Sequence, residues 1–249
     1  MAMTAPASFA RPQIAVNTGY SREEYSVAPA GWNQWTQITA AGAASNWGIL
    51  AGQSVVRRFG FTDRQATLGT SVKTGKSTGL EAKISVCADA QVLPRLSGDL
   101  TVYQGLGPGV SLSPAYRYSN YPTADVHMFV LGAEWEASAA LTLLSRGYLT
   151  LTRFKGGGAE GLTPAVLAQA KLSPVSWLSI VPSYAYRRES FQSGAPGSFG
   201  SGEFTAHAGR MELRVSSKAN RFAFAAWSYE SRTPAALLRQ YEFGLGLGF

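Results

Sequence analysis

The sequence predicts an all-β fold, a transmembrane antiparallel β-barrel of about 14 strands. Segments of about ten residues, in which apolar and polar side chains alternate, recur along the whole chain. Charged residues make up only 15% of the chain, as expected for a barrel whose outer band must be uncharged. No apolar run approaches the length of about 20 residues that a membrane-spanning helix requires.

The alternating segments can be assigned to fourteen strands, and counts of twelve or sixteen are compatible with the same pattern. No segment shows the apolar period of about 3.6 residues that is typical of a helix. In chain order the expected strands are Pro12–Arg22, Gln34–Ala44, Trp47–Arg58, Arg64–Thr74, Leu80–Ala90, Gly98–Leu106, Gly109–Asn120, Asp125–Glu136, Leu141–Phe154, Thr163–Leu172, Ser176–Glu189, Glu203–Ser216, Asn220–Glu230 and Leu238–Phe249.

The alternation is clearest in three of the central segments. In Leu80–Ala90, Leu, Ala, Ile and Val alternate with Glu, Lys, Ser, Cys and Asp. In Gly109–Asn120 and Ser176–Glu189, one parity carries aliphatic residues, Pro and Tyr, and the other is mainly Ser, Ala and Arg. Because alternate side chains of a strand point to opposite faces, each of these strands has one apolar face. In Trp47–Arg58 and Asn220–Glu230, apolar and polar residues are mixed on both parities, so the sequence does not show which face of the strand is apolar.

The last segment predicts how the barrel closes. One parity is entirely apolar, and the other ends in Gly244, Gly246 and Gly248, which we expect to leave room in the lumen at the periplasmic end. A terminal strand that ends in Phe also resembles the signal read by the bacterial barrel-insertion machinery, an expected partner. The lipid-facing residues expected on this barrel-closing strand are Tyr241, Phe243, Leu245, Leu247 and Phe249.

A two-sheet sandwich would alternate in the same way, but connection lengths and aromatic positions favour a barrel. Trp47, Trp135 and Trp177 lie near short turns, as in an interfacial girdle. An even number of strands places both termini at the short-turn end, which is periplasmic in such barrels. The expected long connections are Glu23–Asn33, Lys155–Gly161, Ser190–Gly202 and Ser231–Leu237, and the short ones are Ser45–Asn46, Ser173–Val175 and Ser217–Ala219.

The domain organisation is expected to be simple, with residues 1–11 as a disordered N-terminal segment and residues 12–249 as the barrel. The first residues have neither a charged region nor an apolar core, which is typical of a mature protein or an excised domain. Cys87 is the single cysteine, so neither an intrachain disulfide nor a cysteine metal site is expected. We expect no metal and no cofactor.

The net charge of +7, with 16 Arg and 6 Lys, indicates an affinity for anions. The expected partners are outer-membrane lipid and the phosphates of lipopolysaccharide, and an anionic or polysaccharide cargo. No nucleic-acid-binding motif is present.

Some of the charges fall on the inward parity. An isolated buried charge is costly, so these residues must be wet or paired. The two interpretations are a charge-paired network that stiffens the barrel and an arginine-lined path for an anionic or polyhydroxylated solute. The candidate lumen-lining residues are Arg117, Arg146, Arg187, Arg210, Arg214, Glu134, Glu136, Glu212 and Glu242.

Enzymatic activity is not expected, although some outer-membrane barrels hydrolyse lipids or proteins. Neither His127 nor His207 has the His-x-Ser spacing that would place both groups on one strand face. Asp125 shares the parity of His127 and could orient its imidazole, but a polar pair at the rim is the simpler interpretation. Glu134 and Glu136 share a face and more simply offset inward arginines.

The segments Val92–Arg95, Gly105–Leu112, Tyr116–Tyr121, Val126–Glu134 and Leu143–Tyr148, in this order, resemble the YaiO-type outer-membrane β-barrel family. The resemblance implies a surface or exopolysaccharide-linked barrel that acts alone or, in the second case, with periplasmic repeats as its partner. It identifies no functional residues. The first hypothesis is thus a conduit or assembly component for a surface polysaccharide or another polar or anionic solute. The alternative is a structural barrel with a closed lumen, whose extracellular loops bind a partner.

Overall fold

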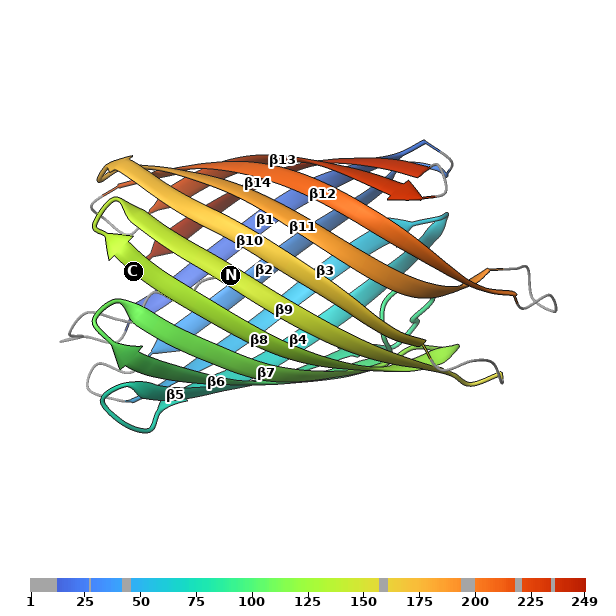
Figure 1. Cartoon of the computed structure of the whole chain (residues 1–249), viewed down its shortest axis with the longest axis horizontal. Helices are drawn as coiled ribbons and strands as arrows, with labels where there is room; N and C mark the ends of the chain where they lie inside the picture. The colour runs from blue at the N-terminus through green and yellow to red at the C-terminus, as the bar shows by residue number, and fades with distance from the viewer. Residues whose placement is uncertain are drawn as a thin grey trace.

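The computed structural model is a closed antiparallel barrel, which confirms the predicted fold class and strand count (Figure 1). The structure describes residues 13–26, 28–41, 46–156, 161–193, 200–217, 221–233 and 236–249. The predicted N-terminal segment 1–11 lies outside these ranges. The strands are β1 (Gln13–Tyr25), β2 (Gly31–Ala41), β3 (Trp47–Arg58), β4 (Phe61–Lys73), β5 (Thr78–Cys87), β6 (Leu96–Gly107), β7 (Val110–Asn120), β8 (Ala124–Ser138), β9 (Leu141–Phe154), β10 (Gly161–Val175), β11 (Leu178–Ser193), β12 (Gly200–Ser216), β13 (Phe222–Thr233) and β14 (Ala236–Gly248).

Each strand pairs with its neighbours in sequence, and β14 pairs with β1 to close the barrel. The closing register runs from the pair Ala15 and Gly248 to the pair Tyr25 and Leu238. Closure leaves no free sheet edge, which a barrel in lipid requires because an unpaired backbone group is costly there. The register also places the end of β14 beside the start of β1, at the end of the barrel that carries the short turns.

Several strands extend further toward the loop end than the alternation predicts. β1 continues to Tyr25, so the expected long connection Glu23–Asn33 shrinks to residues 26–30. β11 and β12 likewise extend to residues 193 and 200, and β13 extends to Thr233. Backbone pairing continues beyond the lipid-facing band, where side chains no longer need to alternate. These three connections are therefore shorter than expected, and residues 194–199 and 234–235 in the last two lie outside the described ranges.

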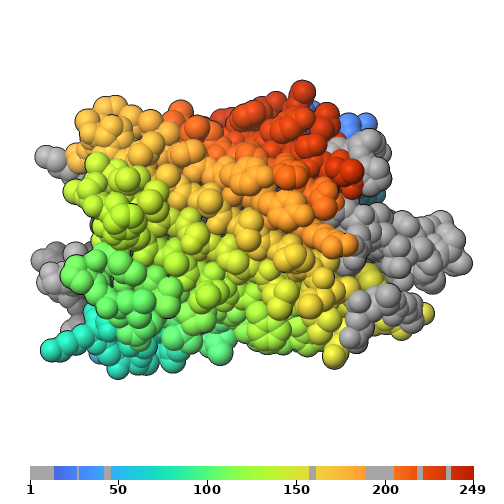
Figure 2. Space-filling view, viewed as in Figure 1, coloured from blue at the N-terminus to red at the C-terminus, as the bar shows by residue number. Residues whose placement is uncertain are grey.

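An apolar belt forms the outer surface, one face of which is shown in Figure 2. On β14, Phe243, Leu245 and Leu247 are 57%, 56% and 45% exposed, and every other strand carries large exposed apolar side chains in the same way. Trp47 and Trp135 lie at the turn end of this belt, half exposed. A soluble protein would not expose so much apolar surface, whereas a bilayer covers it. None of the described residues belongs to a helix long and apolar enough to cross a membrane.

The glycine parity of β14 does not leave the open space that its sequence predicts. A Cβ atom added to Gly244 or Gly246 would overlap the ring of Phe224 or Phe222, respectively. A Cβ on Gly19 of β1 would overlap the indole of Trp35. Rings from β13 and β2 therefore lie over the glycines, because an aromatic side chain reaches across to a neighbouring strand that has no side chain there.

Candidate functional site: the inner wall of the barrel

The nine lumen candidates all lie on the inward parity of their strands. On β12, for example, Met211 and Leu213 are exposed on the outer surface, and Glu212 between them is buried. Paired residues of adjacent strands lie on the same face of the sheet. The register of each strand pair therefore shows which residues of the neighbouring strand also face the lumen. The candidates come from β7 (Arg117), β8 (Glu134, Glu136), β9 (Arg146), β11 (Arg187), β12 (Arg210, Glu212, Arg214) and β14 (Glu242).

Four of the candidates form one chain of ion pairs across β12 and β14. Arg210 donates hydrogen bonds to Glu212 and Glu242, each over 2.7 Å. Arg214 lies 3.1 Å from the other oxygen of Glu212. Its guanidinium also lies 4.7 Å from the centroid of the Phe222 ring. Every charge in this chain has an opposite charge beside it, so the wall here presents both donors and acceptors with little net charge.

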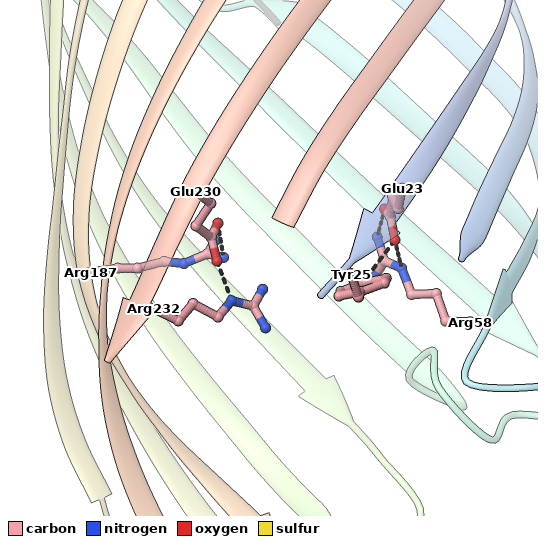
Figure 3. Close-up of polar contacts among 6 residues, drawn as sticks. All are labelled: Glu23, Tyr25, Arg58, Arg187, Glu230 and Arg232. Atoms are coloured by element: carbon pink, nitrogen blue, oxygen red, sulfur yellow. Dashed lines mark hydrogen bonds and ion pairs between the residues drawn. The ribbon is translucent and has the colours of Figure 1, made fainter. Parts of the chain in front are cut away.

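A second cluster lies nearer the loop end, where Glu230 of β13 joins two arginines (Figure 3). Arg187 donates to one carboxylate oxygen over 2.5 Å, and Arg232 donates to the other. The Glu230 side chain is 8% exposed, whereas Arg187 is 33% exposed. Of the three, only Arg187 was a candidate from the sequence, because Arg232 was expected to lie in a loop.

A third cluster, also drawn in Figure 3, was missed from the sequence because Glu23 was assigned to a connection. Glu23 of β1 is 2% exposed and accepts hydrogen bonds from Arg58 of β3 over 2.7 Å and from the Tyr25 hydroxyl over 2.6 Å. β2 lies between these strands, and Gly31 leaves room for the pair: its added Cβ would lie 3.3 Å from the Glu23 carboxylate. Continued alternation of Ser21, Glu23 and Tyr25 is the sequence signal for this cluster.

The connection between β5 and β6 is held in place by Asp63 of β4, which is fully buried. The Asp63 carboxylate accepts hydrogen bonds from the backbone N–H groups of Gln91, Val92 and Leu93, over 3.1, 2.7 and 2.7 Å. Charge-assisted bonds of this kind are stronger than neutral ones. They fix residues 88–95 at the loop end of the barrel. Asp63 was not a candidate from the sequence, because its partners are backbone groups that no motif marks.

The wall formed by β5 to β9 is less connected. Arg117 pairs with Asp99 and Lys83 pairs with Glu81. Among the residues that the structure describes, Arg146, Glu134 and Glu136 form no ion pair. All three face the lumen, and Arg146 and Glu134 lie close enough to Tyr103 to interact electrostatically with its hydroxyl group.

The inward side chains are accessible rather than packed. Arg117 and Arg214 are 53% and 41% exposed, and Arg210 is 32% exposed although it makes two ion pairs. A solid core would bury these groups, whereas here the accessible space lies inside a closed barrel. The barrel interior therefore leaves room for water beside these side chains.

Both histidines lie on the outer surface, near the loop end. The Nδ1 atom of each shares a hydrogen bond with a tyrosine hydroxyl of the preceding strand. The partner is Tyr116 for His127 (2.7 Å) and Tyr184 for His207 (2.6 Å). Asp125 instead accepts a hydrogen bond from Tyr118 over 2.8 Å. The Asp–His pairing considered from the sequence is therefore not formed. Within the described ranges, no group of three His, Cys, Asp or Glu side chains could hold a metal ion.

The outer surface is asymmetric in charge. At the loop end, the lipid-facing parity carries exposed arginines on β1, β3, β4, β9, β11 and β14. At the turn end, the described strands carry no lipid-facing cation. We call this set the arginine rim: Arg22, Arg57, Arg64, Arg153, Arg188 and Arg239.

Comparison with known proteins identifies the fold. No protein-family model and no curated relative matches the chain. Among solved structures, the loop-L8 deletion of the outer membrane protein OmpT of Vibrio cholerae aligns with a TM-score of 0.56 and 7% identity, over 96% of this chain and 99% of that one. A bacterial polysaccharide outer membrane secretin aligns with a TM-score of 0.54 and 10% identity, over 97% of this chain and 99% of that one. OpdQ of Pseudomonas aeruginosa aligns with a TM-score of 0.51 and 10% identity, over 96% of this chain and 98% of that one. The chain thus has the fold of bacterial outer-membrane barrels, and this fold and the apolar belt place it in that membrane.

Proposed function

We propose that the protein is a conduit of the outer membrane for polar, hydroxyl-rich solutes, including segments of a surface polysaccharide. The observation that carries the proposal is the accessibility of the inward charged residues: Arg117, Arg210 and Arg214 are 32–53% exposed inside a closed wall. A purely stiffening network would be packed and dry. A wall in contact with water supports passage of solutes that exchange hydrogen bonds with it.

The pairing of charges favours a particular kind of solute. Arg210 lies between two glutamates, and Glu230 lies between two arginines. Such a wall offers donors and acceptors in alternation without a strong field of one sign. Sugar hydroxyls use both roles, so the wall suits neutral or weakly anionic carbohydrate better than a highly charged polymer.

Two similarities point to the same class of cargo. The resemblance to YaiO-type barrels implies a link to exopolysaccharide. One solved barrel with the same fold is a polysaccharide outer membrane secretin. At 10% identity, the similarity to the secretin shows a shared fold only, and a polysaccharide cargo for this chain is our proposal.

The test is conductance of the purified full chain in planar bilayers, with swelling of proteoliposomes in sugar solution as a second readout. We expect discrete current steps and swelling with small sugars. A protein that is folded on a heat-modifiability gel but gives neither current nor swelling would overturn the proposal.

The alternative, a docking barrel with a closed lumen, is favoured by one feature. β11 and β12 are the longest strands, with 16 and 17 residues, and Figure 1 shows them reaching beyond their neighbours at the loop end. If the conduit tests fail and shortening this hairpin abolishes adhesion of cells that display the protein, the docking function replaces the conduit.

We also propose that the arginine rim contacts lipopolysaccharide, with the loops outside and the termini in the periplasm. Arg57 and Arg64 lie on the lipid-facing parity of adjacent strands, where phosphates of the outer leaflet would be accessible. Replacing both with Glu should lower the lipopolysaccharide that copurifies with the barrel. Arg221→Glu, at the exposed turn end, is the matched control. Equal lipid content in both variants would contradict the assignment.

A further inference from the structure

Three aromatic side chains cover the inner wall where the barrel closes. Trp35 of β2 lies over Gly19 of β1, and Phe224 of β13 lies over Gly244 of β14. Gly19 and Gly244 are directly paired across the closing seam. Aromatic rings thus approach the same glycine pair from both sides. We call Trp35, Phe224 and the neighbouring Phe222 the aromatic strip.

Two rings of the strip, Phe222 and Phe224, are stacked along β13. The centroids of the Phe222 and Phe224 rings are 6.5 Å apart, with 30° between the ring planes. Three strand spacings of about 4.8 Å separate β13 from β2, so the strip spans about 14 Å of the inner wall. All three side chains are only half-buried. Filling the space over the glycines therefore leaves part of each ring exposed to the lumen.

Polar groups border the strip on the same face. Asn17 of β1 is paired with Gly246 and with Gln37 of β2, so both amides point into the lumen. The Asn17 oxygen lies within 2.6 Å of the position that a Cβ on Gly246 would take, and is thus adjacent to the Phe222 ring. The Arg214 guanidinium lies over the Phe222 ring, 4.7 Å from its centroid, and 5.7 Å from the centroid of the Phe224 ring. The two Phe rings of the strip therefore have a guanidinium over them, and Phe222 also has an amide beside it.

This combination matches the chemistry of a sugar ring. A pyranose has a C–H face that stacks on an aromatic ring and a rim of hydroxyls that bond amides and guanidinium groups. A hydrocarbon would not use the amides, and a small inorganic anion would not use the rings. We propose that the aromatic strip is a binding path for oligosaccharide inside the barrel, an inference that rests on the conduit function proposed above.

The test is block of single-channel current by maltohexaose and by cellohexaose, with polyethylene glycol of equal size as the polymer that cannot stack. We expect at least one of the sugars to interrupt the current in discrete, concentration-dependent events, and the glycol to do so far less. Open channels that neither sugar blocks more than the glycol does would overturn the strip while leaving the conduit standing. Absence of both channels and swelling in sugar solution would instead overturn the conduit.

Variants separate binding from the structural role of the rings. Trp35→Leu and Phe224→Leu keep an apolar side chain over the glycines and remove the flat ring. Each should weaken sugar block about tenfold, which corresponds to about 1.4 kcal/mol. Phe224→Tyr, which keeps a ring, should retain the block. Phe129→Leu makes the same change on the outer surface, where Phe129 is 54% exposed, and should leave the block unchanged. Equal block in all four folded variants would overturn the proposal.

Discussion

Glu230 is the residue whose removal tests the paired inner wall most severely. Its side chain is 8% exposed and is shared by Arg187 and Arg232, which are 33% and 24% exposed. Glu230→Gln keeps the shape of the side chain and removes the charge, so two neighbouring guanidinium groups lose the carboxylate that they share. Breaking a fully buried pair costs about 3–5 kcal/mol. Because both arginines reach solvent, we expect a smaller loss of about 2 kcal/mol in unfolding free energy.

Urea unfolding of the barrel in lipid vesicles, followed by tryptophan fluorescence, measures this loss. The matched control is Glu24→Gln, which removes a carboxylate that is 41% exposed and pairs with Arg22, which is 59% exposed. That change should cost less than about 1 kcal/mol. Glu230→Gln should also shift the reversal potential in a salt gradient toward anion selectivity, because positive charge then dominates the wall. Equal stability of the two variants, with unchanged selectivity, would refute the inference that Glu230 compensates both arginines.

Three further predictions concern other parts of the barrel. Asp63→Asn weakens the bonds to the β5–β6 connection, so limited proteolysis within residues 88–95 should become faster; an unchanged cleavage rate would mean that other contacts hold this segment. Gly244→Ala should lower the folding yield measured by gel mobility, because its Cβ overlaps the Phe224 ring, and adding Phe224→Ala should restore the yield; no rescue would show that ring overlap is not the cause. His127→Ala and His207→Ala should leave the membrane lipid profile unchanged by mass spectrometry, and an altered profile would reopen the lipid-enzyme hypothesis.

The fold could be predicted from the sequence because strand parity and chain length are local properties. The bounds Trp47–Arg58 and Leu141–Phe154 agree with β3 and β9, since turn residues flank both segments. The inward side of Arg210 and Glu212 follows from parity alone. Parity gives the face of a residue, however, and its partners depend on register across several strands.

The missed residues show the limits of this reasoning. Glu23 and Arg58 are brought together across β2, and nothing within either segment marks the other. Asp63 binds backbone groups of a distant connection. β13 has apolar residues on both parities, so the inward position of Phe222 and Phe224 becomes apparent only with the glycines of β14 beside them.

The most direct test of the central claim is chemical access to the inner wall during current recording. In a Cys87→Ser background, Ser183→Cys places a thiol on the inward parity of β11, opposite Arg210, and Leu213→Cys places one on the lipid-facing surface. We predict that a water-soluble, membrane-impermeant thiol reagent modifies Ser183→Cys and reduces the single-channel current stepwise, and leaves Leu213→Cys channels unchanged. An unreactive thiol at position 183 in a folded barrel, or modification without any change in current, would contradict a water-filled conduit.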